Sequence, residues 1–244
     1  MLNRIQIERY SRQIKIPEVG LEGQKKLLKS KVLVIGAGGL GSSAIQFLSA
    51  AGVGRLGIVD YDRVEISNLQ RQTIHAGKIG LNKAVSAKIF VKELNEDIKV
   101  DAYPTKIEEI PEIIKKYDIV LDCTDNLESK FFINDLCIRY NTSYVHASAV
   151  GFMGEIMTVI PKTTACYRCL FKSIPKEVIT SEEFGVISAA PGVVGAMQAL
   201  EAIKYLLGVG NLITNRLLYM DFLSMEFVDI KVERDPNCLG CGTI

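Results

Sequence analysis

The sequence lacks two features that mark large classes of proteins: an excess of charge of one sign and a long apolar run. Lysine and arginine number 29 against 28 aspartates and glutamates, which leaves a net charge of +1. This balance gives no electrostatic reason to expect binding to nucleic acid or to an anionic membrane. No uninterrupted apolar stretch reaches the roughly 18–20 residues that a membrane-spanning helix needs. We therefore predict neither a nucleic-acid nor a membrane partner.

The amino-terminal segment MLNRIQIERYSRQIK is charged and has no apolar core of the kind that secretory signals contain. Six cysteines without such a signal favour a reducing compartment, where metal binding is commoner than disulfide formation. We expect a cytoplasmic protein. No internal repeat occurs, and 244 residues of which 48% are hydrophobic can form one domain over residues 1–244.

The first 150 residues alternate between short apolar runs and helical patterns. Buried parallel strands read as continuous apolar runs, whereas helices show apolar residues every three or four positions. The predicted strands are 31–36, 55–60, 99–104, 118–123 and 143–149, and the predicted helices are 4–16, 22–29, 40–52, 82–94, 108–116 and 127–140. This alternation indicates an α/β fold with a Rossmann-like, doubly wound sheet. We assign residues 1–150 to a nucleotide-binding half.

After residue 150 the pattern changes. Residues 155–161 predict a strand, residues 193–208 predict an amphipathic helix, and residues 216–222 and 226–233 predict an antiparallel hairpin. The sheet is therefore expected to be mixed, with antiparallel strands in its carboxyl-terminal part. Residues 170–190 form an irregular stretch, and loops of this length are often functional.

Two Cys-x-x-Cys pairs, Cys166/Cys169 and Cys238/Cys241, stand far apart in the chain. Two such pairs supply the four sulfurs of a closed, tetrahedral zinc site, which stabilises a fold and leaves no position for water. Two disulfides, a redox pair or unrelated surface cysteines are the alternatives. We predict a structural zinc that ties the last residues to the loop in a partner-binding half, 151–244. Cys123 and Cys137 lie in apolar segments and are expected to be buried.

The segment GAGGLG at 36–41 follows a predicted strand and opens a predicted helix. Glycines let the backbone approach a phosphate, and a helix amino terminus offers free N–H groups and positive potential. Asp60 ends the next strand, where a carboxylate can accept hydrogen bonds from a ribose. This combination predicts an adenine nucleotide but does not separate NAD from ATP. A tight turn without a ligand is the other possibility.

The following segments carry polar residues that suit a polyphosphate. Asn68 and Arg71 lie in SNLQRQ, and Lys83 begins a predicted helix. A predicted strand ends at DCTDN, whose Asp125 could bind magnesium beside a triphosphate. Singly, these residues could be solvated charges or a helix cap. Their joint occurrence favours Mg-ATP.

Eight segments together closely resemble the ThiF/MoeB/HesA family, bacterial and archaeal relatives of the ubiquitin-activating enzymes, with MoeB and ThiF as the nearest types. They are RYSRQI, GAGGLG, AGVGRLGIVDYD, SNLQRQ, LDCTDN, CYRC, QALEAIK and CLGC. The resemblance implies ATP-dependent adenylation of the terminal glycine of a small ubiquitin-like sulfur-carrier protein that ends in Gly-Gly. Pyrophosphate leaves, and a thiocarboxylate is later formed for thiamine or molybdenum cofactor biosynthesis.

The resemblance also implies roles for individual residues. Arg12, Arg71, Lys83 and Asp125 would act in catalysis, with Arg12 reaching into the neighbouring subunit of a homodimer and Asp125 holding Mg2+. The four paired cysteines match the zinc ligands. The residues expected to contact the nucleotide are Gly36, Gly38, Gly39, Gly41, Asp60, Asp62, Ser67, Asn68, Arg71, Lys83, Asp125 and Asn126.

One departure from the family concerns a cysteine that many relatives carry before the last long helix. Residues 173–185 contain none, and Ser181 falls near that position. A serine hydroxyl needs a dedicated base to act as a nucleophile, so a covalent link to the partner is not expected. The chain also lacks a rhodanese-like segment, which implies a separate sulfur donor. An NAD-dependent oxidoreductase and a catalytically idle scaffold are the alternative functions.

Overall fold

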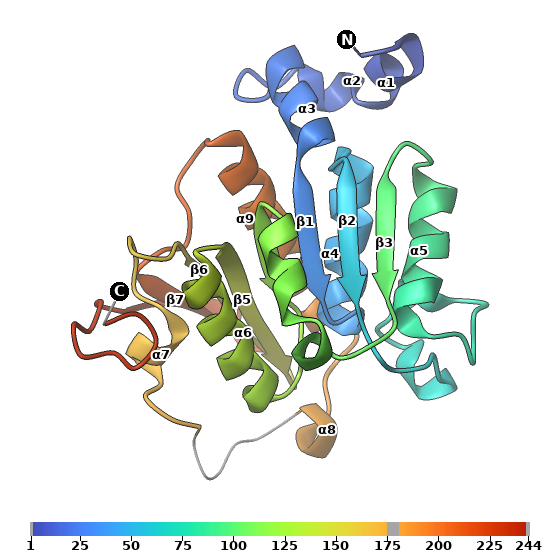
Figure 1. The fold of residues 1–244 in the computed structure, drawn as a ribbon. Helices are drawn as coiled ribbons and strands as arrows, with labels where there is room; N and C mark the ends of the chain where they lie inside the picture. The colour runs from blue at the N-terminus through green and yellow to red at the C-terminus, as the bar shows by residue number, and fades with distance from the viewer. Residues whose placement is uncertain (1, 175–180, 243–244) are drawn as a thin grey trace.

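A computed structural model describes residues 2–174 and 181–242, with the side chains of 181 and 182 left out. Eight strands form one sheet in the order β3-β2-β1-β4-β5-β6-β7-β8 (Figure 1). The strands are β1 Lys31–Ile35, β2 Arg55–Val59, β3 Lys99–Tyr103, β4 Ile119–Asp122, β5 Ser143–Val150, β6 Met153–Val159, β7 Arg216–Asp221 and β8 Glu226–Lys231. The first five run parallel, and β6, β7 and β8 are antiparallel to their neighbours. The predicted mixed sheet is confirmed.

Helices cover both faces of the sheet. The longer ones are α3 Gly20–Lys29, α4 Gly39–Ala51, α5 Lys83–Leu94, α6 Leu127–Tyr140 and α9 Ala189–Leu207. The short ones are α1 Arg4–Arg9, α2 Ser11–Ile14, α7 Tyr167–Leu170 and α8 Ser181–Phe184, with 3-10 turns η1 Ile66–Asn68, η2 Thr73–His75, η3 Ile107–Glu109 and η4 Pro111–Lys116.

The core divides between the two faces of β1. Val32 and Val34 pack in a cluster with residues of α4, α5 and α9, whereas Leu33 and Ile35 pack in a second cluster with residues of α6. Successive side chains of a strand point to opposite faces, and both faces here are covered. This explains why the strand reads as a continuous apolar run in the sequence.

The helices of the first half begin at the end of the sheet where the parallel strands finish. Each of α4, α5 and α6 follows a segment that leaves the carboxyl end of a parallel strand. The helices α1 and α2 lie at the opposite end of the strands, at the top of Figure 1. Ligands in such sheets bind beyond the carboxyl ends of the strands. The candidate binding site and the amino-terminal helices therefore lie at opposite ends of the strands.

Two sequence predictions differ in detail from the structure. The helix expected over 4–16 is two helices, α1 and α2, which meet at Tyr10. Tyr10 is buried, and its hydroxyl accepts a hydrogen bond from Asn95 Nδ2 at 2.8 Å, which anchors the junction. The helix expected over 108–116 is the pair η3 and η4, because Pro111 cannot continue the first turn. In the described part of the chain, no helix has both the length and the apolar character to span a membrane.

Candidate functional site

The glycine loop between β1 and α4 is closely packed against two neighbours. Gly36 has φ +93°, and a Cβ atom there would lie 2.6 Å from the Cys123 carbonyl oxygen. A Cβ atom on Gly41 would lie 2.0 Å from the Gly36 carbonyl oxygen. Both contacts are shorter than any side chain allows, so these positions require glycine. The loop consequently sits against the turn after β4 and exposes the amino terminus of α4.

The peptide groups of Ala37 are fixed from both sides. Asp60 Oδ2 accepts a hydrogen bond from the Ala37 N–H at 2.8 Å, and His75 Nε2 lies 2.8 Å from the Ala37 carbonyl oxygen. Burial raises the pKa of Asp60, opposed by the Ala37 N–H and by Lys83. Burial lowers the pKa of His75, so the neutral ring can donate to Ala37 while Ser86 Oγ occupies Nδ1.

An ion pair lies beside Asp60. Lys83 Nζ is 3.0 Å from Asp62 Oδ2, and the Lys83 side chain is 9% exposed. Asp60 Oδ1 also accepts a hydrogen bond from the Asp62 N–H at 2.8 Å. Asn82 caps α5 and donates to the carbonyl oxygens of Asp60 and Asp62 at 2.9 and 3.0 Å. This set of contacts places an ammonium group and two carboxylates next to the glycine loop.

The segment SNLQRQ folds over the same loop. A Cβ atom on Gly39 would lie 3.5 Å from Arg71 Cδ, and one on Gly38 would lie 3.7 Å from Gln72 Nε2. Arg71 Nη1 lies 3.4 Å from the Ser67 carbonyl oxygen. Asn68 Oδ1 accepts from the Glu65 N–H at 3.0 Å and so fixes the turn η1. The structure therefore places Arg71 and Gln72 beside the loop glycines, with Ser67 and Asn68 in the turn that precedes them.

Asp125 and Asn126 lie in the turn between β4 and α6. Asn126 is the amino-terminal cap of α6, and its Oδ1 accepts from the Ser129 N–H at 2.8 Å. Asp125 is exposed. After the charge of Asp62 and burial, the negative charge of Asp125 also raises the pKa of Tyr61, so the Asp125 turn lies in the neighbourhood of the Asp60–Asp62 segment. Since Asn126 caps the helix, the alternative role of Asp125 as that cap is wrong.

Arg12 is the one predicted catalytic residue that lies apart from this site. It is exposed on α2, next to Gln13, whose Nε2 donates to the Ala51 carbonyl oxygen at the end of α4. The glycine loop is at the start of α4, and the 13 residues of this helix span about 20 Å. Within one chain, Arg12 and the glycine loop are thus at opposite ends of a helix.

The four paired cysteines meet in one cluster, whose sulfur atoms all lie within 4.8 Å of one another. Cys166 Sγ is 3.6 Å from Cys238 Sγ, and Cys169 Sγ is 3.5 Å from Cys241 Sγ. Four sulfurs around zinc, each about 2.3 Å from the metal, would be about 3.8 Å apart. The donor set and spacing therefore fit a tetrahedral zinc ion and do not fit a disulfide.

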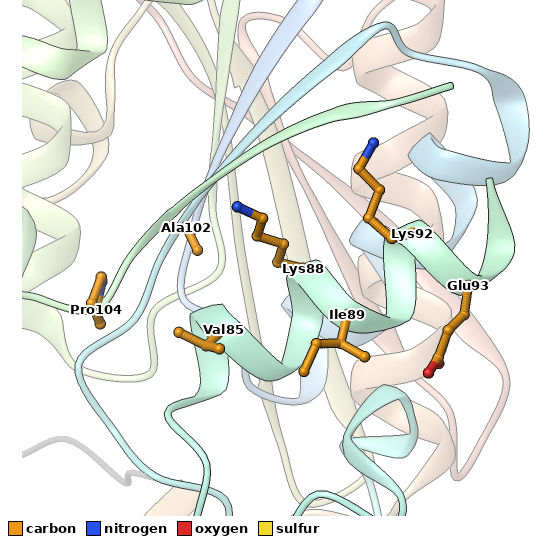
Figure 2. A pocket seen from close by; sticks show the side chains of 7 residues that line it. All are labelled: Val85, Lys88, Ile89, Lys92, Glu93, Ala102 and Pro104. Carbon is orange, nitrogen blue, oxygen red and sulfur yellow. The ribbon is translucent and has the colours of Figure 1, made fainter. Parts of the chain in front are cut away.

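A separate groove of about 690 Å3 lies between α5 and β3 (Figure 2). It is lined by Val85, Lys88, Ile89, Lys92, Glu93, Ala102 and Pro104. None of these residues was predicted as a site residue, and none belongs to the glycine loop. The candidate site is instead the polar surface at the carboxyl ends of the parallel strands.

Comparison with protein families matches residues 10–240 to the ThiF family. The SAMP-activating enzyme E1 of Haloferax volcanii is 42% identical over 99% of this chain and 91% of its own length. The chain belongs to the ThiF family. This ThiF-family chain is also 42% identical to the adenylyltransferase and sulfurtransferase MOCS3 of Drosophila sechellia, over 97% of the chain. It spans 53% of the length of that relative.

Solved structures agree with the ThiF-family fold. E. coli MccB with MccA-N7isoASN superposes with a TM-score of 0.84 at 23% identity, over 98% of this chain and 76% of that chain. E. coli MccB with ATP gives a TM-score of 0.82 at 24% identity, over 99% and 75%. At this identity the similarity establishes the fold.

Several residues that support the ThiF-family site were missed by sequence reasoning. His75, Lys130 and His146 are buried outside the recognised motifs, and Gln198 is buried within the QALEAIK segment, where it was given no role. Their contacts are created only by the fold. His75 could have been noticed as one of only two histidines. The stretch 175–180 of the predicted functional loop lies outside the described residues, as does the side chain of Ser181.

Proposed function

We propose that this protein uses Mg-ATP to adenylate the carboxyl-terminal glycine of a small ubiquitin-like sulfur-carrier protein, with release of pyrophosphate. The observation that carries the proposal is the convergence of the glycine loop, Asp60, Arg71 and Lys83 at one edge of the sheet, beside the Asp125 turn. The chain that bears this site is 42% identical to enzymes named for carrier activation and adenylyl transfer.

The residues of the site suit such a transfer. The amino terminus of α4 and the loop N–H groups would face the phosphates, and Asp60 retains lone pairs for ribose hydroxyls. Arg71 and Lys83 would neutralise phosphate charge, and Asp125 would hold Mg2+. Bound Mg2+ would neutralise negative charge on the triphosphate and so reduce its repulsion of an attacking carboxylate. Positioning and charge neutralisation suffice, because a glycine carboxylate needs no base to attack the α-phosphate.

A homodimer would complete the site with Arg12. Large apolar side chains are exposed on adjoining helices: Ile5 and Ile7 on α1, Phe47 on α4, and Val193 and Leu200 on α9. A two-fold axis that crosses this face perpendicular to α4 would make the two copies of α4 antiparallel. The end of one α4, where Arg12 lies, would then meet the start of the other, where the partner's glycine loop lies.

The remaining parts of the proposal concern the carrier and the sulfur. The cysteine cluster would hold zinc as a structural ion in the partner-binding half, residues 151–244, whereas residues 1–150 bind the nucleotide. Carriers of the thiamine type and of the molybdopterin type both end in Gly-Gly and fit equally. The sulfur would come from a separate donor.

Exchange of labelled pyrophosphate into ATP tests the proposal. Purified protein, Mg-ATP and a Gly-Gly carrier of either type are expected to exchange label, and a carrier that lacks its last glycine is the matched control. Carrier-independent binding of NAD in preference to ATP would instead identify an oxidoreductase. Carrier binding without exchange would identify a scaffold.

A further inference from the structure

Four charged or ionisable side chains form a buried cluster directly behind the Asp125 turn. They are Asp122 on β4, Lys130 on α6, His146 on β5 and Glu155 on β6. Asp122, Lys130 and His146 are 0%, 2% and 1% exposed, so none of them can reach a substrate at the surface. The proposed adenylation chemistry uses none of the four, and their presence needs another explanation.

The Lys130 ammonium group is held by three acceptors. Its Nζ donates to the carbonyl oxygens of Thr124 and Ala147 at 2.8 and 2.6 Å and lies 3.6 Å from Asp122 Oδ2. Burying an ammonium group costs free energy unless its donors are satisfied, and an apolar side chain of this size would avoid that cost. What Lys130 achieves beyond packing is to join the turn after β4 to the neighbouring strand β5.

Asp122 holds the same turn from the other side. Its Oδ1 accepts from the Thr124 N–H at 3.1 Å and from the Thr124 hydroxyl at 2.6 Å. Thr124 is therefore bonded at its N–H, its hydroxyl and its carbonyl oxygen. The next residue is Asp125, and Asn126 is fixed in turn by capping α6.

The outer members of the cluster orient Asp122. His146 Nδ1 lies 3.2 Å from Asp122 Oδ2, and His146 Nε2 lies 3.2 Å from Glu155 Oε1. Carboxylate oxygens only accept hydrogen bonds, so this geometry suits a ring that donates from both nitrogens. His146 on β5 thus contacts the Asp122 carboxylate directly and links it to Glu155 on β6.

We propose that this cluster, defined by Asp122, Lys130, His146 and Glu155, positions the Asp125 carboxylate, with Lys130 as its central positioning residue. The backbone on both sides of Asp125 is held, while the Asp125 side chain itself is exposed. The consequence for a bound divalent cation rests on the proposed function. The rigidity of the turn does not depend on the proposed function.

The test compares Lys130→Met with Lys130→Arg and with Ile133→Ala. Ile133 is buried in α6 one turn further along, so its truncation destabilises the same helix without touching the turn. The first measurement is amide hydrogen exchange of residues 123–126 in ligand-free protein. Lys130→Met is expected to speed this exchange about tenfold relative to Ile133→Ala, and Lys130→Arg is expected to reverse part of the change.

The second measurement is ATP binding by calorimetry, with Mg2+ and with chelator. Lys130→Met is expected to lose about tenfold of the Mg2+-dependent affinity while its affinity in chelator stays within about twofold of wild type. Equal exchange of the turn in Lys130→Met and Ile133→Ala would overturn the proposal.

A milder variant covers the case in which Lys130→Met does not fold. Thr124→Val removes one hydrogen bond to Asp122 and keeps the shape of the side chain, and it is expected to speed exchange of the same amides. Unchanged exchange in folded Thr124→Val would likewise overturn the proposal. A wild-type protein that binds no Mg-ATP refutes the proposed function, whereas faster exchange of the turn in these variants still confirms the positioning role.

Discussion

At the scale of single residues, the site separates groups that face solvent from groups that hold them. Asp125 is exposed and Arg71 is half-buried, whereas Asp60, His75 and Lys130 are buried and hydrogen-bonded to backbone atoms. Replacing a presented group removes a ligand contact and leaves the fold intact. Replacing a holding group leaves a buried partner unsatisfied and affects stability as well.

The first prediction concerns Asp125→Ala. A single carboxylate that holds a catalytic metal contributes several kcal/mol, so pyrophosphate exchange is expected to fall by about a hundredfold or more. Glu128→Ala removes another exposed carboxylate, in the first turn of α6, and serves as the matched control. Circular dichroism should be the same for both variants. Full exchange activity in Asp125→Ala would remove Asp125 from the catalytic set.

The second prediction is that no stoichiometric thiol-labile adduct forms between enzyme and carrier. Outside the cysteine cluster only Cys123 and Cys137 remain, both buried. Burial, and then the negative charge of Asp122, raise the pKa of the Cys123 thiol, so its reactive thiolate is disfavoured. Intact mass spectrometry after incubation with ATP and carrier measures this. An adduct that disappears in Cys123→Ser would show that the thiol is reactive after all.

At the scale of elements, the strands and helices were predictable because their patterns are local. The run VLVI after Lys31 is apolar since both faces of β1 are covered there. The hairpin of β7 and β8 follows from two amphipathic runs around a short turn. The break at Tyr10 was not predictable. It depends on the contact with Asn95, more than eighty residues away.

The site was predictable to a similar extent and for a similar reason. Glycine, lysine and aspartate in GAGGLG, GLNK and DCTDN signal a phosphate site locally, and the structure brings those segments to one edge. In the buried cluster around Lys130, only Asp122 lies in one of these segments, and nothing local marks its partners. Its members come from four elements and only become neighbours through the strand order β4-β5-β6.

The third prediction concerns the elements joined by the cysteine cluster. The protein is expected to contain about one zinc per chain, and Cys238→Ser is expected to lose it. Because metal binding stabilises the folded state, the variant should melt at lower temperature, with early exchange of amides in residues 232–242. The glycine loop is formed by other segments, so ATP affinity should change little. Elemental analysis that finds no zinc in reduced wild-type protein would contradict the prediction.

At the scale of the whole molecule, the position of Arg12 decides how many chains make one site. The fourth prediction uses two inactive variants, Arg12→Ala and Asp125→Ala. If Arg12 acts across a two-fold interface, mixing them in equal amounts after subunit exchange restores about a quarter of wild-type activity, because half of the dimers carry one complete site. Action within one chain predicts no restoration. Size-exclusion chromatography with light scattering verifies that dimers are present.

The fifth prediction concerns acid. Burial alone would raise the pKa of Asp122, but the charge of Lys130 and the hydrogen bond from His146 prevail and lower it to about 2. A carboxyl group with a lowered pKa stabilises the fold above its unfolded pKa, about 3.9. That contribution is lost as the pH falls from about 4 to about 2.

Urea unfolding measured between pH 6 and pH 2.5 checks this expectation. Asp122→Asn should be less stable than wild type at pH 6, and the difference should narrow as the solution becomes more acidic. A difference that does not depend on pH would show that the carboxylate charge is not responsible.

Ala37 makes two hydrogen bonds, donating from its N–H to Asp60 and accepting at its carbonyl oxygen from His75, and these affect the thermodynamics of nucleotide binding. The loop that would face the phosphates is set by its own chain before any nucleotide arrives. Little conformational entropy then remains to be lost on binding. Less of the binding free energy is used to order the loop, and more of it can stabilise the transition state. His75→Ala would free the loop, and nucleotide binding to that variant should show a more unfavourable entropy than binding to wild type.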